Sequence, residues 1–153
     1  MSNTQPGAFL PIAAMMFAAG LGIPVFAAFN SALGKQLGGA VAATTVSFAI
    51  GLVIALVLLA VTGLPQRHTI TFETPHIWLG AVFIIFYGVS VTFAAPRIGL
   101  GNAIFFVLLG QIVAAAAIDH FGWLGAIQTA MTPKRAIGIA VMALGLYLAR
   151  KPA

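Results

Sequence analysis

Two side chains that could bind a solute or a proton, Gln111 and Asp119, lie in one apolar stretch from Leu100 to Trp123. At a helical rise of about 1.5 Å per residue, this stretch is long enough to cross a hydrocarbon core of about 30 Å. Gln111 falls roughly 18 Å before Trp123 and Asp119 roughly 6 Å before it, so the amide is deep and the carboxylate lies near an interface. An ionisable group inside a membrane helix is costly and therefore indicates a functional site.

Each of these two groups also has a structural interpretation. The chain contains two acids, Glu73 between two apolar runs and Asp119 within one. Because Phe121 and Trp123 follow Asp119, the carboxylate could instead mark a helix end that enters an aromatic belt at the membrane surface. Gln111 could hydrogen-bond a neighbouring helix. The residues alone leave both interpretations open.

Tyr87 is a third candidate for the pathway of a substrate or a proton. It stands near the centre of the third apolar run, where its hydroxyl could line a cavity or hydrogen-bond another helix. Ser47, in the second run, belongs to a row of small residues at four-residue steps. Such a row lets another helix approach closely, so the pattern favours packing over chemistry there.

The first apolar run contains two glycines and a proline, at Gly20, Gly22 and Pro24. Pro24 removes a helical hydrogen bond and pushes against the carbonyl of Gly20, so we expect a kink or a short unwound piece at these residues. Irregular backbone at membrane depth is tolerated where protein or a water-filled cavity covers it, which predicts that this run faces inward. Alternatively, the proline and glycines only reflect the composition of membrane helices.

The composition identifies an integral membrane protein. Hydrophobic residues make up 61 % of the chain, charged residues 6 %, and the mean hydropathy is +1.11. A soluble protein needs a far more charged surface. The seven Lys and Arg residues lie between or beyond the apolar runs. Their positions therefore indicate how the chain is oriented in the membrane, and we expect no nucleic-acid partner. The partner we expect is the lipid bilayer.

The residues that bear chemistry argue against an enzyme and against a metal site. The chain has no cysteine, which excludes disulfides, thiolate catalysis and cysteine-ligated metals. His68 and His76 have no further ligand at metal spacing, and the membrane acid has no second carboxylate or nucleophile–base pair beside it. We therefore expect no catalytic residue, no metal and no cofactor.

The apolar runs predict an all-α protein with about five membrane spans in a single domain, residues 1–153. The expected spans are residues 8–33, 40–62, 76–95, 100–123 and 135–149. A tight turn beginning at Pro96 should make the third and fourth spans antiparallel neighbours. The N-terminal residues lack the basic start of a secretory signal.

The short fifth span carries small residues on one face. Gly138, Gly145 and Ala149 repeat at helical spacing, so we expect this face to contact another helix, and assign it to a dimer interface.

Five spans would place the two termini on opposite sides of the membrane. The basic residues then divide three to four, with Arg67, Lys134 and Arg135 on one side and Lys35, Arg97, Arg150 and Lys151 on the other. Because the Lys/Arg excess sets orientation, this small difference predicts weak N-out insertion or insertion in both orientations.

The order of short motifs resembles the YdcZ-type five-span branch of the drug/metabolite transporter (EamA-like) superfamily. The matching segments are Asn30-Ser-Ala-Leu-Gly34, Ser47-Phe48 with Gly51, Pro75 with Trp78-Leu-Gly80, Gly110-Gln111, and Ile118-Asp-His-Phe-Gly122. Members of the branch often have a glutamine one turn before the asparagine, where this chain has Phe26. The resemblance adds Asn30 and Ser47 to the candidate pathway.

The resemblance implies that the chain is one half of an inverted-repeat transporter in the bacterial cytoplasmic (inner) membrane. A second copy in antiparallel orientation or a paralogous chain would complete the transporter. We therefore expect a secondary transporter of an unknown small molecule, with proton coupling through Asp119. The alternatives are a dual-topology ion channel and a membrane scaffold that transports nothing; no glycine-rich run that would build a channel filter occurs at midplane.

Overall fold

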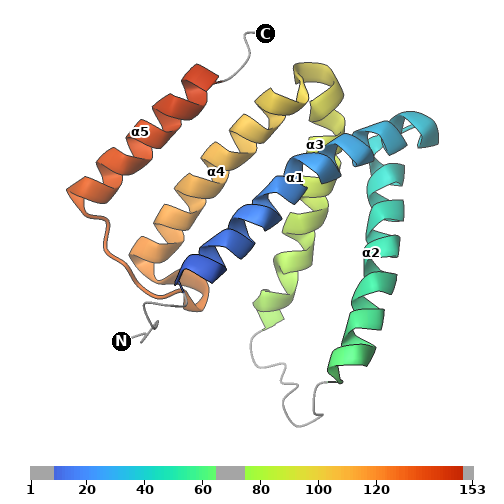
Figure 1. Ribbon diagram of the computed structural model, residues 1–153, viewed down its shortest axis with the longest axis horizontal. Coiled ribbons are helices and arrows are strands. Elements are labelled where there is room, and N and C mark those ends of the chain that lie inside the picture. The colour runs from blue at the N-terminus through green and yellow to red at the C-terminus, as the bar shows by residue number, and fades with distance from the viewer. Residues whose placement is uncertain (1–8, 65–74, 150–153) are drawn as a thin grey trace.

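The computed structural model describes residues 9–64 and 75–149, and all regular structure within them is helical (Figure 1). Its elements are α1 (Phe9–Leu37), α2 (Ala40–Thr62), the 3₁₀ turn η2 (Pro75–Leu79), α3 (Gly80–Ile98), α4 (Leu100–Phe121), the 3₁₀ turn η3 (Trp123–Gly125) and α5 (Pro133–Ala149). Four of these helices, counting the last turn of η2 with α3, are long and apolar enough to cross a membrane. The 17 residues of α5 span only about 25 Å. The prediction of an all-α membrane protein is confirmed.

The helix bounds differ from those expected mainly at the ends of α1 and α3. Helix α1 continues to Leu37, beyond the expected end at residue 33. Helix α3 continues through Pro96 to Ile98, so the prediction that Pro96 begins the turn is wrong. The chain reverses at Gly99, whose φ of 86° is a conformation that side chains with a Cβ rarely adopt. The reversal makes α3 and α4 antiparallel neighbours, as expected.

Helix α1 is continuous across Gly20 and Pro24. The prediction of a short unwound piece is therefore wrong, because the helix runs unbroken from Phe9 to Leu37. In Figure 1, α1 follows a curved path across the bundle. The kink at Gly20 and Pro24 stays a prediction.

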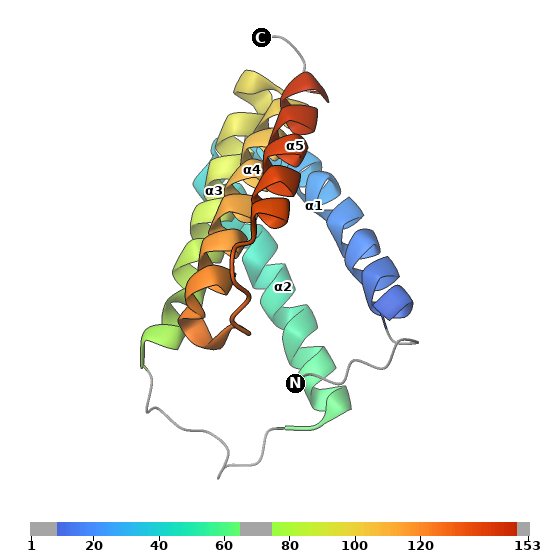
Figure 2. The ribbon, with the colours of Figure 1, turned by 90° about the vertical axis from the view of Figure 1, so that its left-hand side faces the viewer.

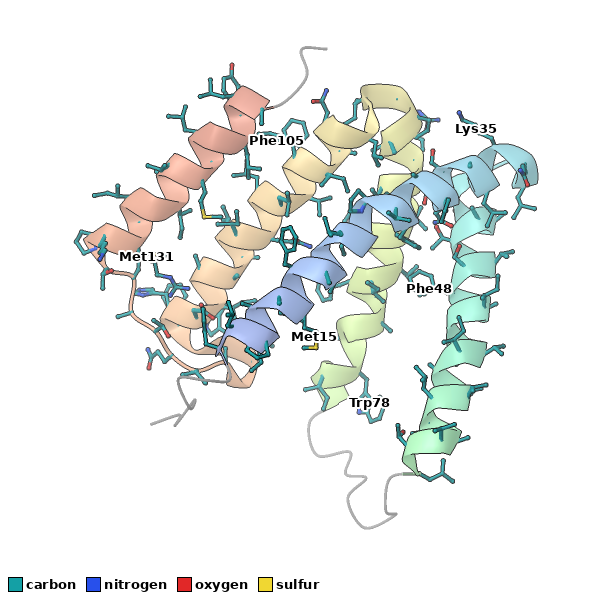
Figure 3. All side chains as sticks on the ribbon, in the orientation of Figure 1. Met15, Lys35, Phe48, Trp78, Phe105 and Met131 are labelled. Atoms are coloured by element: carbon teal, nitrogen blue, oxygen red, sulfur yellow. The ribbon has the colours of Figure 1, made fainter. Side chains whose placement is uncertain are left out.

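Three helices form a layer that α1 crosses. Figures 1 and 2 show α3, α4 and α5 side by side, and in Figure 1 α1 runs obliquely over α4 and α3 to meet α2, which stands beside α3. Helix α1 packs mainly on α2 and α3, whereas α5 packs on α4. The start of α2 and the turn between α3 and α4 lie at one end of the bundle, and Figure 3 places Lys35 at that end and Trp78 at the other.

Close packing inside the bundle is limited to a few small side chains. Ala27 of α1, Val91 and Ala95 of α3, and Ala103 of α4 form the buried cluster. Most large apolar side chains point outward, as expected where lipid is the solvent. Among the described glycines, Gly88 has the tightest surroundings, since a Cβ there would lie 2.9 Å from the methyl group of Thr44 on α2.

Candidate functional site

A hollow of about 420 Å³ lies between α1 and α4, and its one long polar side chain is Gln111. The α1 wall consists of Gly20, Pro24 and two neighbouring apolar residues, so the structure brings the predicted kink and the predicted midplane amide together. Pro24 has no N–H to offer the carbonyl of Gly20. The Gln111 amide makes no hydrogen bond to any residue in the described part of the chain. This hollow therefore offers hydrogen-bonding groups within apolar walls.

Tyr87, the predicted cavity residue on α3, borders two further hollows. One of about 290 Å³ lies between α3 and α4, and one of about 240 Å³ lies between α1, α2 and α3. The Tyr87 ring stacks on Phe26 with 6.3 Å between ring centroids. Its hydroxyl oxygen is buried and has no hydrogen-bond partner among the described residues. A buried polar atom without a partner is uncommon and often indicates a ligand, a bound water or strain.

The three hollows share their walls. Val107 borders the hollow beside Gln111 and the one between α3 and α4, while Ile23 borders the hollow beside Gln111 and the one next to α2. Tyr87 borders both of the hollows that do not contain Gln111. They surround the place where α1 passes over α3 and α4 (Figure 1). We call these three hollows together the crossing site.

The other two predicted pathway residues, Asn30 and Ser47, lie together in a separate hydrogen-bond network. The Asn30 amide donates to Thr44 Oγ1 at 3.2 Å and to Thr92 Oγ1 at 2.6 Å, and its Oδ1 accepts from Ser47 Oγ at 2.5 Å. Thr92 Oγ1 in turn donates to the carbonyl of Gly88 at 2.6 Å. We call Asn30, Thr44, Ser47 and Thr92 the polar knot, because it ties α1, α2 and α3 together.

The polar knot lies apart from the crossing site. Asn30 is 1 % exposed, its amide nitrogen and its oxygen make three hydrogen bonds within the network, and no member of the knot lines the crossing site. Thr92 borders a different hollow of about 490 Å³, beside Lys35 and Arg97. Sequence reasoning did not identify Thr44 and Thr92, which are also buried. Their hydroxyls within apolar runs are the signal that could have drawn attention to them.

Asp119 lies in the last turn of α4, away from the crossing site. Its carboxylate forms an ion pair with Arg135 in the first turn of α5, and the two side chains are 35 % and 31 % exposed. Arg135 also donates to the carbonyl of Thr129 at 3.2 Å, and Thr129 N–H donates to the carbonyl of Asp119 at 2.8 Å. Asp119 is eight residues, or about 12 Å of helix, from Gln111.

The segment between α4 and α5 is held by further hydrogen bonds around Asp119. Met131 N–H donates to His120 Nδ1 at 3.0 Å, and Gln128 Nε2 donates to the carbonyl of His120 at 3.2 Å. Helix α5 then begins with Pro133, and Thr132 Oγ1 accepts the N–H of Arg135 at 3.2 Å in the manner of an N-cap. This geometry agrees with the alternative in which Asp119 fixes a helix end, and its part in proton coupling stays a prediction.

The small-residue face of α5 is free of contacts with α4. A Cβ added at Gly138 or Gly145 would meet no atom within 4 Å, and Ala149 is exposed. The side of α5 that faces α4 carries Ala136 and Ile139 instead. The predicted dimer contact is thus accessible to another helix.

Among the described residues there is no cluster of three side chains that could hold a metal ion. His68 and the side chain of His76, which the sequence analysis considered as ligands, lie outside that description.

The apolar helices and the small number of buried side chains define the class of a multi-pass membrane protein. The family model described as "putative inner membrane exporter, YdcZ" matches residues 11–148, which is most of the chain. The chain therefore belongs to this family, and the resemblance found in its motifs is confirmed. No curated protein and no solved structure matches it. It is a multi-pass inner-membrane protein of an exporter family, which is not a family of enzymes.

Proposed function

We propose that this chain is one half of a secondary exporter and that its small-molecule substrate binds at the crossing site. The observation that carries the proposal is a pair of polar groups that have no hydrogen-bond partner among the described residues, the Gln111 amide and the Tyr87 hydroxyl, on side chains that line apolar hollows. Ligand sites have this composition, with mainly apolar walls and a few polar groups that fix orientation.

A second chain would complete the crossing site. In the single chain Gln111 is exposed, and an amide facing hydrocarbon is costly. A second copy in antiparallel orientation, or a paralogous chain, would cover it. The accessible Gly138 and Gly145 face of α5 supports such a contact, and the nearly even division of basic residues supports the antiparallel copy.

Proton coupling in this proposal runs through Asp119. A proton on the carboxylate removes the charge that holds Arg135, which would release the start of α5 from the end of α4. Asp119→Asn should then abolish transport driven by a pH gradient while the protein stays folded. Arg135→Gln keeps the titratable group and should retain a pH dependence. Wild-type pH dependence in Asp119→Asn would show that Asp119 is only a structural anchor.

Solute flux in proteoliposomes tests the export function against the alternatives. A carrier gives slow, saturable flux, an ion channel gives ohmic current, and a scaffold gives neither. Gln111→Ala should weaken the apparent affinity several-fold through a lost hydrogen bond. Gln128→Ala, which removes an amide from the connection between α4 and α5, is the matched control and should leave the affinity unchanged. No saturable flux for any of a panel of small aromatic solutes would contradict the proposal.

A further inference from the structure

The walls of the crossing site carry no charge among the described residues. The whole chain has only two acids, and of these Asp119 is paired with Arg135 at the end of α4, while Glu73 lies between the second and third spans. The described basic residues, Lys35, Arg97, Lys134 and Arg135, all lie in the first or last turn of a helix or next to it. A charged ligand at the crossing site would therefore have no partner of opposite charge.

The absence of an opposite charge decides which ligands the crossing site can hold. Moving an ion from water into an apolar environment without a partner costs several kcal/mol or more. An uncharged molecule avoids this cost and gains from contact with the apolar walls. These walls include Phe26, Phe48 and the ring of Tyr87, and in Figure 3 the side chain of Phe48 lies between α2 and α3. They suit a ligand built around one or two rings.

The polar groups of the crossing site indicate which polar group a ligand should carry. The Tyr87 hydroxyl is a buried donor that no described residue satisfies, and the Tyr87 side chain borders two of the three hollows. Leaving a buried donor unpaired is costly, and a ligand acceptor would recover part of this free energy. Gln111 provides a second donor and an acceptor on the other side of Val107.

We propose that the crossing site selects neutral, mainly apolar molecules that carry a hydrogen-bond acceptor, and that Tyr87 donates to this acceptor. The proposal rests on the proposed function, since it names the substrate class of the same site. A lipophilic cation would meet no carboxylate among the described residues that line the crossing site.

Three naphthalene derivatives of similar size separate the ligand classes. They are 2-acetylnaphthalene, which is neutral and has an acceptor, 2-isopropylnaphthalene, which has none, and the 2-naphthyltrimethylammonium cation. Binding is measured by equilibrium dialysis against the protein in lipid nanodiscs, with binding to empty nanodiscs subtracted. We expect the ketone to bind several-fold tighter than the hydrocarbon and at least tenfold tighter than the cation. This comparison uses the unaltered protein.

Two variants locate the binding. Tyr87→Phe removes only the hydroxyl and should lower the affinity for the ketone about three- to tenfold, to the level of the hydrocarbon. Tyr147→Phe changes the only other tyrosine, on α5, and should leave the affinity unchanged. Val107→Trp fills the wall between two hollows and should abolish binding of both neutral probes.

Several results would overturn the proposal. It fails if the cation binds as tightly as the ketone, if ketone and hydrocarbon bind equally, or if Tyr87→Phe binds the ketone like the unaltered protein. Failure of the export function has a different signature, in which the ketone binds in a Tyr87-dependent manner but no solute shows saturable flux. If the cation binds tightly and also shows saturable flux, the export function stands, but the proposal that the crossing site selects neutral molecules is rejected.

Discussion

The polar knot and the crossing site use side-chain amides in opposite ways. In the knot, Asn30 is buried between three helices, and both its amide nitrogen and its oxygen are hydrogen-bonded to hydroxyls. In the crossing site, Gln111 lines an apolar hollow and bonds to no described residue. Residue type in a membrane helix therefore does not by itself indicate the role of an amide. We infer that a binding group is one that the neighbouring helices leave without a hydrogen-bond partner.

The two regions also differ in how closely their helices approach. Beside the knot, Gly88 lets α3 touch α2, whereas at the crossing site α1 and α4 leave a hollow of about 420 Å³. Figure 2 shows α1 and α2 meeting at one end of the bundle and diverging from each other toward the other end. One region therefore holds the helices together, and the other leaves room for a ligand.

The largest expected effect is loss of the helix contact beside the knot. Gly88→Leu places a branched side chain where a Cβ alone would already be 2.9 Å from Thr44 and 3.1 Å from Phe48. We expect the free energy of unfolding to fall by about 3 kcal/mol. The matched control is Gly80→Leu on the same helix, where the space is open. Unfolding in detergent measures both, and similar stabilities would show that the close approach is unimportant.

Exchanging the two amides for leucine tests the comparison directly. Asn30→Leu removes three hydrogen bonds and should lower the free energy of unfolding by about 2 kcal/mol. Gln111→Leu should leave it within about 0.5 kcal/mol, because no protein contact is lost. The same thermal unfolding series measures both variants. A large loss for Gln111→Leu would mean that Gln111 is a structural group after all.

A smaller effect is expected at the proposed dimer face. Gly145→Leu should reduce cross-linking of two chains about fivefold, because close backbone approach drives helix association in lipid. Gly51→Leu on α2, where the space is likewise open, is the control. Unchanged cross-linking in Gly145→Leu would move the interface to another helix.

The smallest expected effect concerns the orientation of the chain in the membrane, because the two sides of the expected topology differ by one basic residue. A cysteine introduced at the C-terminus should react with impermeant label from both sides of the membrane, and the chain has no native cysteine to interfere. Two lysines added beside Arg67 should favour N-in, and a lysine added near Arg97 should favour N-out. Labelling from one side only would require a paralogous partner of opposite orientation.

The helices could be predicted well because long apolar runs specify them directly. Residues 40–62 were predicted correctly, since glycines flank this run on both sides. The end of α3 could not be predicted from Pro96 alone. A proline in the last turn disturbs only one carbonyl of the helix, and the reversal needed the positive φ that Gly99 adopts.

The site could be predicted only in part, because its geometry depends on how helices cross. Helical rise placed Gln111 deep and Asp119 near a surface, and the structure has Asp119 at a helix end. That Gln111 faces Gly20 and Pro24 follows from the crossing of α1 over α4, which no local pattern encodes. The same holds for Asn30, whose partner Thr92 is 62 residues away, and for the pairing of Asp119 with Arg135.

The position of the polar knot in the chain has a consequence for biogenesis. All four residues of the knot lie within the first 92 residues of the chain. The ribosome has therefore synthesised all of them before the span that contains Gln111 begins. Because chains assemble from the N-terminus during synthesis, the first three helices can lock to one another in the translocon region without the last two. We therefore expect α4 to pack against a three-helix unit that has already formed, so that the hollow between α1 and α4 forms last.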